Sequence, residues 1–255
     1  MSEIALSVRG LRKSFGSLVV ASDIALDLPA GARYALIGPN GAGKTTFINL
    51  LTGVLPPTGG RVLLGGRDIT HMTQAERVKL GLARTFQINR LFRGLSALEN
   101  VCMAIAERVG AARSMFYPAG RRRDIIDEAM GLLQTLKLAD AARHRVSELP
   151  YGRQRLVELA ITIALSPTVL LLDEPAAGVP SAESHIILDA VERLPENIAV
   201  LIIEHDMDVV FRFAKRVTVM VGGALFAEGT PREIEADPRV REVYLGQSPH
   251  RAAHA

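Results

Sequence analysis

The sequence predicts an α/β fold with a mostly parallel sheet flanked by helices. The first observation is a series of short aliphatic runs, several of them continuously apolar, as expected of strands buried on both faces. The second is that helical patterns lie between many of these runs, which is typical of a doubly wound sheet. The third is a glycine-rich segment, residues 38–46, that directly follows one of the runs.

The segments with strand composition are spread over most of the chain. They are Ile4–Val8, Tyr34–Ile37, Arg61–Leu64, Leu82–Phe86, Val169–Asp173, Val200–Glu204 and Val217–Val221. The last run is followed by Gly222-Gly223 and further apolar residues, so we expect a hairpin over residues 217–228.

The helical patterns concentrate in the middle of the chain. No strand is predicted from about Ser96 to Ala164, where Leu98–Val109, Arg123–Leu138 and Arg153–Ala164 all show helical spacing. We interpret this region as a helical lobe inserted into the α/β core.

Outside the lobe, helices are expected from Thr73 to about Leu80, where Thr73 and Glu76 have capping-box spacing, and from Ser181 to about Leu194. We therefore expect one domain over residues 1–246. It comprises an α/β core at 1–92 and 165–235, a helical subdomain at 93–164 and a C-terminal tail at 236–255.

Composition excludes several classes of protein. With 48% hydrophobic residues the 255-residue chain has enough aliphatic material for a sizeable core. The 30 basic and 27 acidic residues nearly balance, so no nucleic-acid surface is expected. No apolar run approaches the roughly 20 residues that span a bilayer, and no signal peptide is recognisable, so we expect a cytoplasmic protein. The single cysteine, Cys102, is expected to be a small buried thiol.

The glycine-rich segment has the spacing of a phosphate loop, G-x-x-x-x-G-K-[ST], between a strand and a helix. Glycines let backbone N–H groups turn toward phosphates, and the following helix directs its positive end at them. The lysine would contact the β- and γ-phosphates and the threonine Mg²⁺, so ATP and Mg²⁺ are the expected cofactors. The residues are Gly38, Pro39, Asn40, Gly41, Ala42, Gly43, Lys44, Thr45 and Thr46.

Two carboxylates, Asp173 and Glu174, end the aliphatic run that begins at Val169. Sites of α/β proteins lie at the carboxyl ends of strands. Asp173 is placed to support the Mg²⁺ shell, and Glu174 to orient or deprotonate the attacking water.

With the segment Leu149-Pro150-Tyr151-Gly152-Arg153-Gln154-Arg155 between them, these motifs resemble the ATPase domain of ABC transporters over nearly the whole chain. The resemblance implies a P-loop NTPase core, an antiparallel β subdomain and an inserted helical subdomain. It also implies that Gln87 reaches Mg²⁺ and the attacking water, that His205 contacts the γ-phosphate, and that Phe15 stacks on adenine.

The signature segment differs from the family's common L-S-G-G-Q. In the family this segment contacts the ATP held by the opposite subunit, so Tyr151, Gly152 and Arg153 are the expected contacts. Pro150 replaces the serine and supplies neither a hydroxyl nor an N–H. The loop Ala177–Ser181 lacks the family's usual Asp.

Within the family, the segments around Arg84–Gln87, Glu174–Gly178 and Glu204–Met207 are most similar to those of branched-chain amino-acid importers, in particular the longer of that system's two ATPases. This similarity implies two membrane permease subunits, a second ATPase as a heterodimer or homodimer partner, and indirectly a periplasmic binding protein. It places the chain peripherally at the cytoplasmic face of the inner membrane.

Other interpretations remain open at this point. The chain is also similar to the ATPase of lipopolysaccharide export. A soluble ABC ATPase acting on DNA or ribosomes is disfavoured, because those usually carry coiled-coil insertions or two cassettes. A non-catalytic nucleotide-binding regulator would lack one of Lys44, Glu174 and His205, all of which are present.

Overall fold

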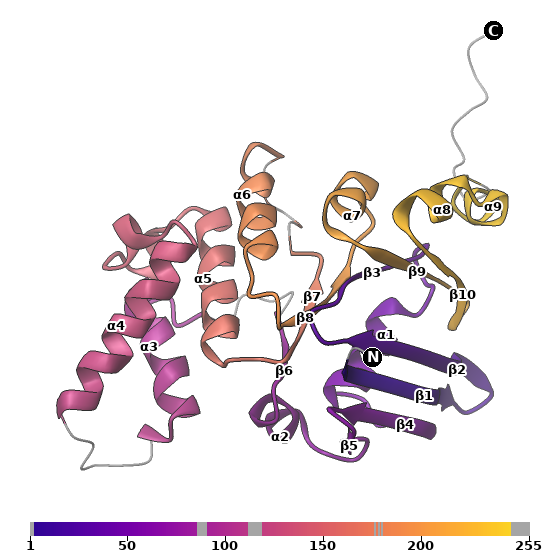
Figure 1. Ribbon diagram of the computed structural model, residues 1–255, viewed down its shortest axis with the longest axis horizontal. Coiled ribbons are helices and arrows are strands. Elements are labelled where there is room, and N and C mark those ends of the chain that lie inside the picture. The colour runs from indigo at the N-terminus through magenta and orange to yellow at the C-terminus, as the bar shows by residue number, and fades with distance from the viewer. Residues whose placement is uncertain are drawn as a thin grey trace, which may run out of the picture. The chain divides into compact units, whose positions relative to one another are not determined.

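The computed structural model describes residues 3–85, 91–111, 119–175, 177, 179 and 181–245 (Figure 1). The chain forms two compact units, one of residues 1–74 with 199–255 and one of residues 75–198. The helices predicted at 93–164 lie in the second unit, together with two strands and two further α-helices.

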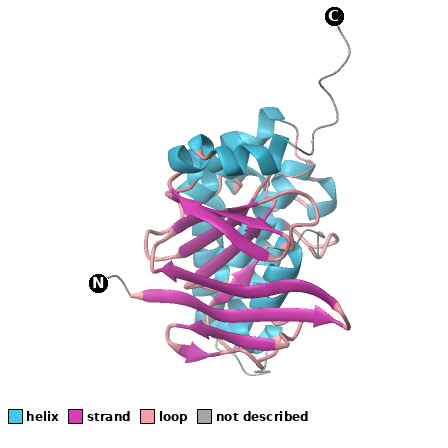
Figure 2. Ribbon diagram, turned by 90° about the vertical axis from the view of Figure 1, so that its right-hand side faces the viewer, coloured by secondary structure: helices cyan, strands magenta, loops and turns pink. Residues whose placement is uncertain are grey.

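The first unit contains an antiparallel sheet. Its strands, in spatial order, are β2 (Leu18–Pro29), β1 (Ile4–Phe15), β4 (Gly59–Leu64) and β5 (Arg67–Asp68). Figure 2 shows the two long strands, β1 and β2, side by side. Leu6 and Val8 lie opposite Leu28 and Leu26, and all four side chains are buried. This sheet confirms the antiparallel part of the predicted fold.

The prediction was wrong about the extent of this sheet. Strand β1 continues to Phe15 rather than ending at Val8, and β2 was not predicted. The second half of β1 contains irregular register, and β2 carries Asp23 and Asp27 on its exposed positions. Neither segment is therefore a continuous apolar run, although both contribute buried aliphatic side chains at intervals.

The first unit also contains parallel strands around β3 (Arg33–Ile37). This strand pairs in parallel with β8 (Ala199–Ile203) on one side and with β9 (Arg216–Val221) on the other. Strand β10 (Ala224–Gly229) pairs antiparallel with β9 through a turn at Gly222 and Gly223, which confirms the predicted hairpin. Every residue of β8 is buried, as its continuous aliphatic sequence predicts.

The helices of the first unit are α1 (Lys44–Thr52), α7 (Met207–Phe213), α8 (Pro231–Ala236) and α9 (Pro238–Leu245). Helix α8 begins with a capping box in which Thr230 and Glu233 bond reciprocally, and with a proline at its first position. Residues 246–255, which are half of the tail predicted at 236–255, lie outside the described residues.

The second unit is mainly helical, and α3, α4 and α5 lie together in it (Figure 1). Its strands β6 (Leu82–Arg84) and β7 (Val169–Asp173) are parallel and buried along most of their length. Its α-helices are α2 (Gln74–Lys79) at the unit boundary, α3 (Ala97–Arg108), α4 (Ala119–Thr135), α5 (Tyr151–Ala164) and α6 (Ser181–Glu192). Short 3₁₀ helices span Ala139–Ala141 and Val146–Glu148.

Several predicted ends differ from the observed ones. Helix α4 stops at Thr135 rather than Leu138, because Lys137 has a left-handed backbone with φ +56°. Helix α5 begins at Tyr151 rather than Arg153, since Pro150 is its N-cap. Strand β6 ends at Arg84, and Phe86 lies outside the described residues.

Cys102 is half-buried, so its thiol is less buried than the sequence predicted. Burial raises the pKa of this thiol above its ordinary value, which keeps it protonated and unreactive at neutral pH. Among the described helices, none has the length and apolar character needed to cross a membrane.

Candidate functional site

The phosphate loop leaves the carboxyl end of β3, the central strand of the parallel group in the first unit. Parallel pairing places Leu36 beside Ile203 of β8, and Ile37 beside Val219 of β9. The residues after β8 therefore reach the same sheet edge as the loop. In α/β proteins this is the edge at which ligands bind.

Two glycines in the loop are required by the backbone around them. A Cβ atom on Gly38 would lie 2.2 Å from the carbonyl oxygen of Met220 in β9. Gly43 has φ +101°, and a Cβ atom there would lie 3.0 Å from the carbonyl oxygen of Val20. Any side chain at these positions would force the loop away from its neighbours, so the glycines maintain the loop's path.

The start of α1 directs backbone N–H groups toward the loop. The N–H of Phe47 donates to the carbonyl oxygen of Gly43 at 2.8 Å, so the helix begins directly at the end of the glycine-rich segment. The loop itself is held by a bond from the N–H of Gly223 to the oxygen of Ala42 at 2.9 Å. This arrangement suits an anionic phosphate, because the N–H groups and the helix dipole both favour negative charge.

Lys44 lies against the loop. Its Nζ donates to the carbonyl oxygens of Gly38 at 2.6 Å and Pro39 at 3.1 Å. The ammonium group is therefore held beside the N–H groups that would receive a phosphate. Asn40, Gly41 and Thr45 are exposed along the loop and helix start, so ligand access is open.

Phe15 ends β1 with a ring that is 52% exposed, which argues against an ordinary core aromatic. The ammonium of Lys13 lies 4.9 Å from the ring centroid and also donates to the carbonyl oxygen of Pro56 at 2.9 Å. An exposed ring of this kind is available for stacking on a base.

His205 directly follows β8, and its side chain is 66% exposed. Its backbone N–H lies 3.3 Å from Oε2 of Glu204, whose side chain is buried. The imidazole Nδ1 is 4.0 Å from the same oxygen. The buried carboxylate thus lies near the exposed imidazole.

In the second unit, the predicted metal-supporting residue Asp173 ends β7 and is buried. Arg84, at the end of the neighbouring strand β6, donates to Oδ2 of Asp173 at 2.5 Å. This contact of Arg84 was not predicted from the sequence. The sequence did contain a signal for this contact: Arg84 is a basic residue in a predicted strand, three positions before Gln87.

Glu174 has an unusual backbone for a residue that is not glycine, with φ +45°. Its carbonyl oxygen accepts the N–H of Ala177 at 3.0 Å. Left-handed backbone costs of order 1–2 kcal/mol for such a residue and concentrates at functional sites. The turn begins directly after Asp173, the last residue of β7.

The signature residues begin α5. Tyr151 is partly exposed, and the guanidinium of Arg155 lies 5.2 Å from its ring centroid. Gly152 is buried, and Arg153 forms an ion pair with Asp140 at 2.7 Å. The hydrogen bond from Arg153 holds the pKa of the Asp140 carboxyl below its ordinary value. Arg153 is therefore a cation restrained at the helix start.

The donor set fits a magnesium ion that is bound mainly through nucleotide phosphates. In the described part of the chain, no three His, Cys, Asp or Glu side chains gather as a metal cage. Mg²⁺ is commonly held by one or two protein oxygens together with phosphates, and the Thr45 hydroxyl and Asp173 carboxylate are of that kind. Gln87, the third predicted ligand, lies outside the described residues.

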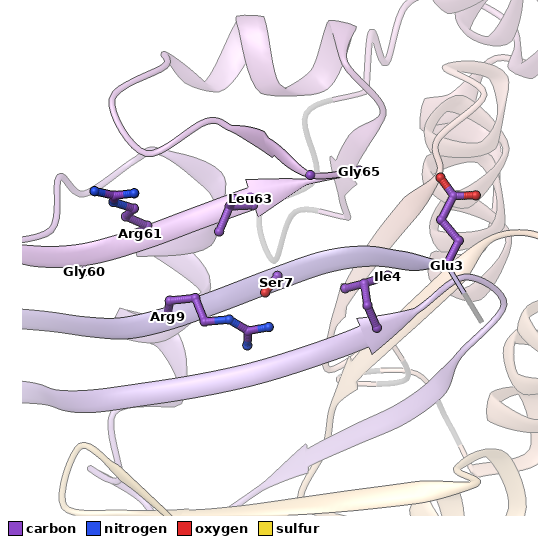
Figure 3. Close-up of a pocket in the computed structure, with 9 residues that line it drawn as sticks. Glu3, Ile4, Ser7, Arg9, Gly60, Arg61, Leu63 and Gly65 are labelled. Atoms are coloured by element: carbon purple, nitrogen blue, oxygen red, sulfur yellow. The ribbon is translucent and has the colours of Figure 1, made fainter. Parts of the chain in front are cut away.

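An open hollow of about 780 Å³ lies elsewhere in the first unit. Figure 3 shows Ile4, Ser7 and Arg9 of β1 beside Arg61 and Leu63 of β4 along this hollow. The described residues that line it include none of those predicted to bind nucleotide. The hollow is therefore distinct from the candidate site.

A model of the ABC transporter family matches residues 21–177. This chain belongs to the ABC transporter family of ATP-binding subunits. A second model, described as branched-chain amino acid ATP-binding cassette transporter, matches residues 224–250.

This ABC ATPase is similar over its whole length to curated relatives. The high-affinity branched-chain amino acid transport ATP-binding protein LivG of Salmonella typhimurium is 37% identical, covering 97% of this chain and 100% of the relative. BraF of Pseudomonas aeruginosa, which carries the same description, is 36% identical with the same coverage.

Solved structures agree with this assignment. The ADP conformation of MJ1267, an ATP-binding cassette of an ABC transporter, has a TM-score of 0.83 and 31% identity, covering 97% of this chain and 100% of that one. The predicted fold class and the prediction of an ATP-hydrolysing transporter subunit are thereby confirmed.

Proposed function

We propose that this ABC ATPase powers the uptake of branched-chain amino acids or closely related small molecules through partner membrane subunits. The observation that carries the proposal is the match of residues 224–250 to the branched-chain amino acid cassette family. This segment lies beyond the general ABC transporter match, which ends at residue 177. The whole-length similarity to LivG and BraF supports the same cargo class.

ATP would bind first through the phosphate loop. The N–H groups of residues 38–46 receive the phosphates, Lys44 places its charge on the β- and γ-phosphates, and Phe15 stacks on the adenine. The hydrogen bonds of Lys44 to the loop carbonyls keep its ammonium at this position before the nucleotide arrives. Little side-chain reorganisation is therefore needed on binding.

Thr45, Asp173 and Gln87 would hold Mg²⁺, which when bound neutralises charge on the phosphate oxygens. Glu174 takes a proton from, or orients, the attacking water. His205 contacts the γ-phosphate and keeps the water in place, with the buried Glu204 beside its imidazole. The strained backbone at Glu174 supports this role, because such strain concentrates at functional sites.

The signature segment would contact ATP held by a second ATPase subunit, either a similar chain or a second copy. Pro150 offers no donor, so the contact depends on the backbone at Tyr151 and Gly152, on the helix dipole and on Arg153. The cation at Arg153 supports binding of an anionic γ-phosphate. Nucleotide then stabilises the closed pair, and hydrolysis removes that stabilisation.

The remaining partners would be two membrane permease subunits and, through them, a periplasmic binding protein. The chain would act peripherally at the cytoplasmic face of the membrane. The helices α3, α4 and α5 provide the lobe on which a helix of a permease subunit could dock.

Transport in reconstituted vesicles tests the proposal. The tagged chain is purified with the membrane subunits that accompany it, placed in proteoliposomes with internal MgATP, and assayed for uptake of labelled Leu, Ile and Val with the associated binding protein. We expect uptake that depends on ATP and is lost with Lys44→Ala.

The matched control is Arg9→Ala, on the hollow outside the proposed site, which should leave uptake intact. The proposed cargo class would be contradicted if Leu, Ile and Val were not taken up and ATP hydrolysis responded instead to a different ligand of the binding protein. If Arg9→Ala abolished ATP binding while Lys44→Ala did not, the proposed nucleotide site at the phosphate loop would be wrong.

A further inference from the structure

A small cavity lies inside the second unit, at the contact between helix α5 and the ends of strands β6 and β7. Its volume is about 20 Å³. The residues that line it include Thr85, Arg155, Glu158, Leu172, Asp173 and Ile187. The cavity is therefore apolar on part of its wall and carries several polar groups on the rest.

The buried polar atoms here that have no hydrogen-bond partner among the described residues include the hydroxyl oxygen of Thr85 and Oε1 of Glu158. Thr85 is only 9% exposed and Glu158 only 8%. A buried polar atom that lacks a partner has lost its hydration without replacement, so native proteins seldom leave one unsatisfied.

The charges around the cavity are compensated. Oε2 of Glu158 accepts from Arg155 at 3.0 Å, and Oδ2 of Asp173 accepts from Arg84 at 2.5 Å. Each carboxylate thus has its own guanidinium partner. A neutral ligand fits this balance better than an ion, because an ion would add uncompensated charge in a buried place.

We propose that this cavity is a binding site for one water molecule. A buried water needs about 10–15 Å³ of accessible space and two to four polar partners, and the cavity meets both conditions. The Thr85 hydroxyl donates to the water, and the water donates to Oε1 of Glu158. Both orphan atoms are satisfied by this arrangement.

The water connects two parts of the chain that the sequence separates widely. Glu158 lies in the second turn of α5, the helix that begins with the signature residues. Thr85 directly follows β6, and its N–H donates to the oxygen of Leu171 in β7 at 3.0 Å. The site thus links the signature helix to the strand that carries Asp173.

Replacing Thr85 by valine tests the proposed water site, because the presence or absence of water predicts a different direction of change in the urea midpoint of unfolding. Valine keeps the shape of threonine and removes only the hydroxyl. If the hydroxyl binds water, the variant loses a hydrogen bond, and we expect the urea midpoint to fall by roughly 0.3–0.5 M. If the hydroxyl has no partner, removing it relieves a penalty, and the midpoint stays unchanged or rises.

Thr218→Val is the matched control. The Thr218 hydroxyl is also buried without a partner among the described residues, but Thr218 does not line this cavity. We expect its midpoint to stay unchanged or to rise. An equal fall in both variants, or no fall for Thr85→Val, would overturn the proposal.

A crystal structure of the wild-type chain at a resolution that shows ordered water provides a second, independent measurement. We expect one electron-density peak within 3.2 Å of both Thr85 Oγ1 and Glu158 Oε1. A dry cavity, or a direct bond between these two groups, would overturn the proposal even if Thr85→Val failed to fold.

Discussion

Arg84 and Asp173 form a buried ion pair at the ends of two neighbouring parallel strands. The guanidinium of Arg84 donates to Oδ2 of Asp173 at 2.5 Å, and the two side chains are 10% and 5% exposed. Strand pairing places Arg84 beside Leu171, two residues before Asp173, so its long side chain runs along the strand to the carboxylate. One oxygen of Asp173 is thereby held, and the carboxylate has a defined orientation.

Replacing Arg84 by methionine should leave Asp173 buried without its charged partner. Breaking a buried pair in this way costs roughly 3–5 kcal/mol, and we expect a loss of this size in the free energy of unfolding in urea. Arg84→Lys should retain part of the stability, because it keeps a positive charge.

Arg9→Met is the comparison for that experiment, since Arg9 pairs with Asp27 at 2.8 Å where both side chains are about half exposed. Its removal should cost less than about 1 kcal/mol. Similar small losses in the Arg84 and Arg9 variants would show that the buried pair does not stabilise the fold.

Gly38→Ala should disrupt the phosphate loop, because its Cβ would lie 2.2 Å from the carbonyl oxygen of Met220. We expect ATP affinity measured by calorimetry to fall at least about tenfold, or 1.4 kcal/mol. Gly131→Ala in α4 is the control, since a Cβ there meets nothing within 4 Å. It should keep ATP affinity and add roughly 0.5–1 kcal/mol of stability.

Two substitutions of Glu174 should separate its backbone from its side chain. Both Glu174→Gly and Glu174→Ala remove the carboxylate, and we expect each to lower ATP turnover by about 10²–10⁴-fold. Glycine accepts the φ of +45° without strain, so its variant should be more stable than the alanine variant by roughly 1 kcal/mol. Unchanged turnover would remove Glu174 from catalysis.

Glu158 should make stability depend on pH. Burial raises the pKa of its carboxyl above the ordinary value of 4.5, and Arg155 opposes the shift only in part. The folded state therefore binds this proton more tightly than the unfolded state, and folding gains stability as the pH falls.

We expect the free energy of unfolding of the wild type to rise relative to that of Glu158→Gln as the pH falls from neutral, through the raised pKa, to about 4.5. Carboxyls with lowered pKa values are common to both proteins, so their effects cancel in the difference. The raised pKa of Glu158 would be contradicted if the difference in the free energy of unfolding between the two proteins did not change with pH. It would also be contradicted if the wild type became relatively more stable as the pH rose.

The local features of this protein were predictable because neighbouring residues determine them. Residues 34–46 contain the end of a strand, a turn and a helix start, so the phosphate loop was recognised without tertiary information. The buried strand β7 was predicted with its observed bounds, Val169–Asp173, because all five of its residues are buried and it is aliphatic up to its final carboxylate. Gln87 remains a prediction, since it lies outside the described residues.

The elements that were missed depend on partners far away in the chain. Strand β2 carries aspartates among its apolar residues and is stabilised by pairing with β1, not by a distinctive sequence pattern of its own. The end of α4 depends on the left-handed backbone of Lys137, which is a residue with no special preference for that conformation.

By itself, the sequence determined the class of fold, the phosphate loop and the two carboxylates after the buried strand, because each depends on residues adjacent in the chain. Only the tertiary structure decided that Arg84 meets Asp173, that Met220 leaves no room for a side chain at Gly38, and that Thr85 and Glu158 share a cavity. These contacts follow from strand register and helix packing, which bring together residues separated by some 70 to 180 positions. The composition and the local spacing of residues do not indicate which of these distant residues come into contact.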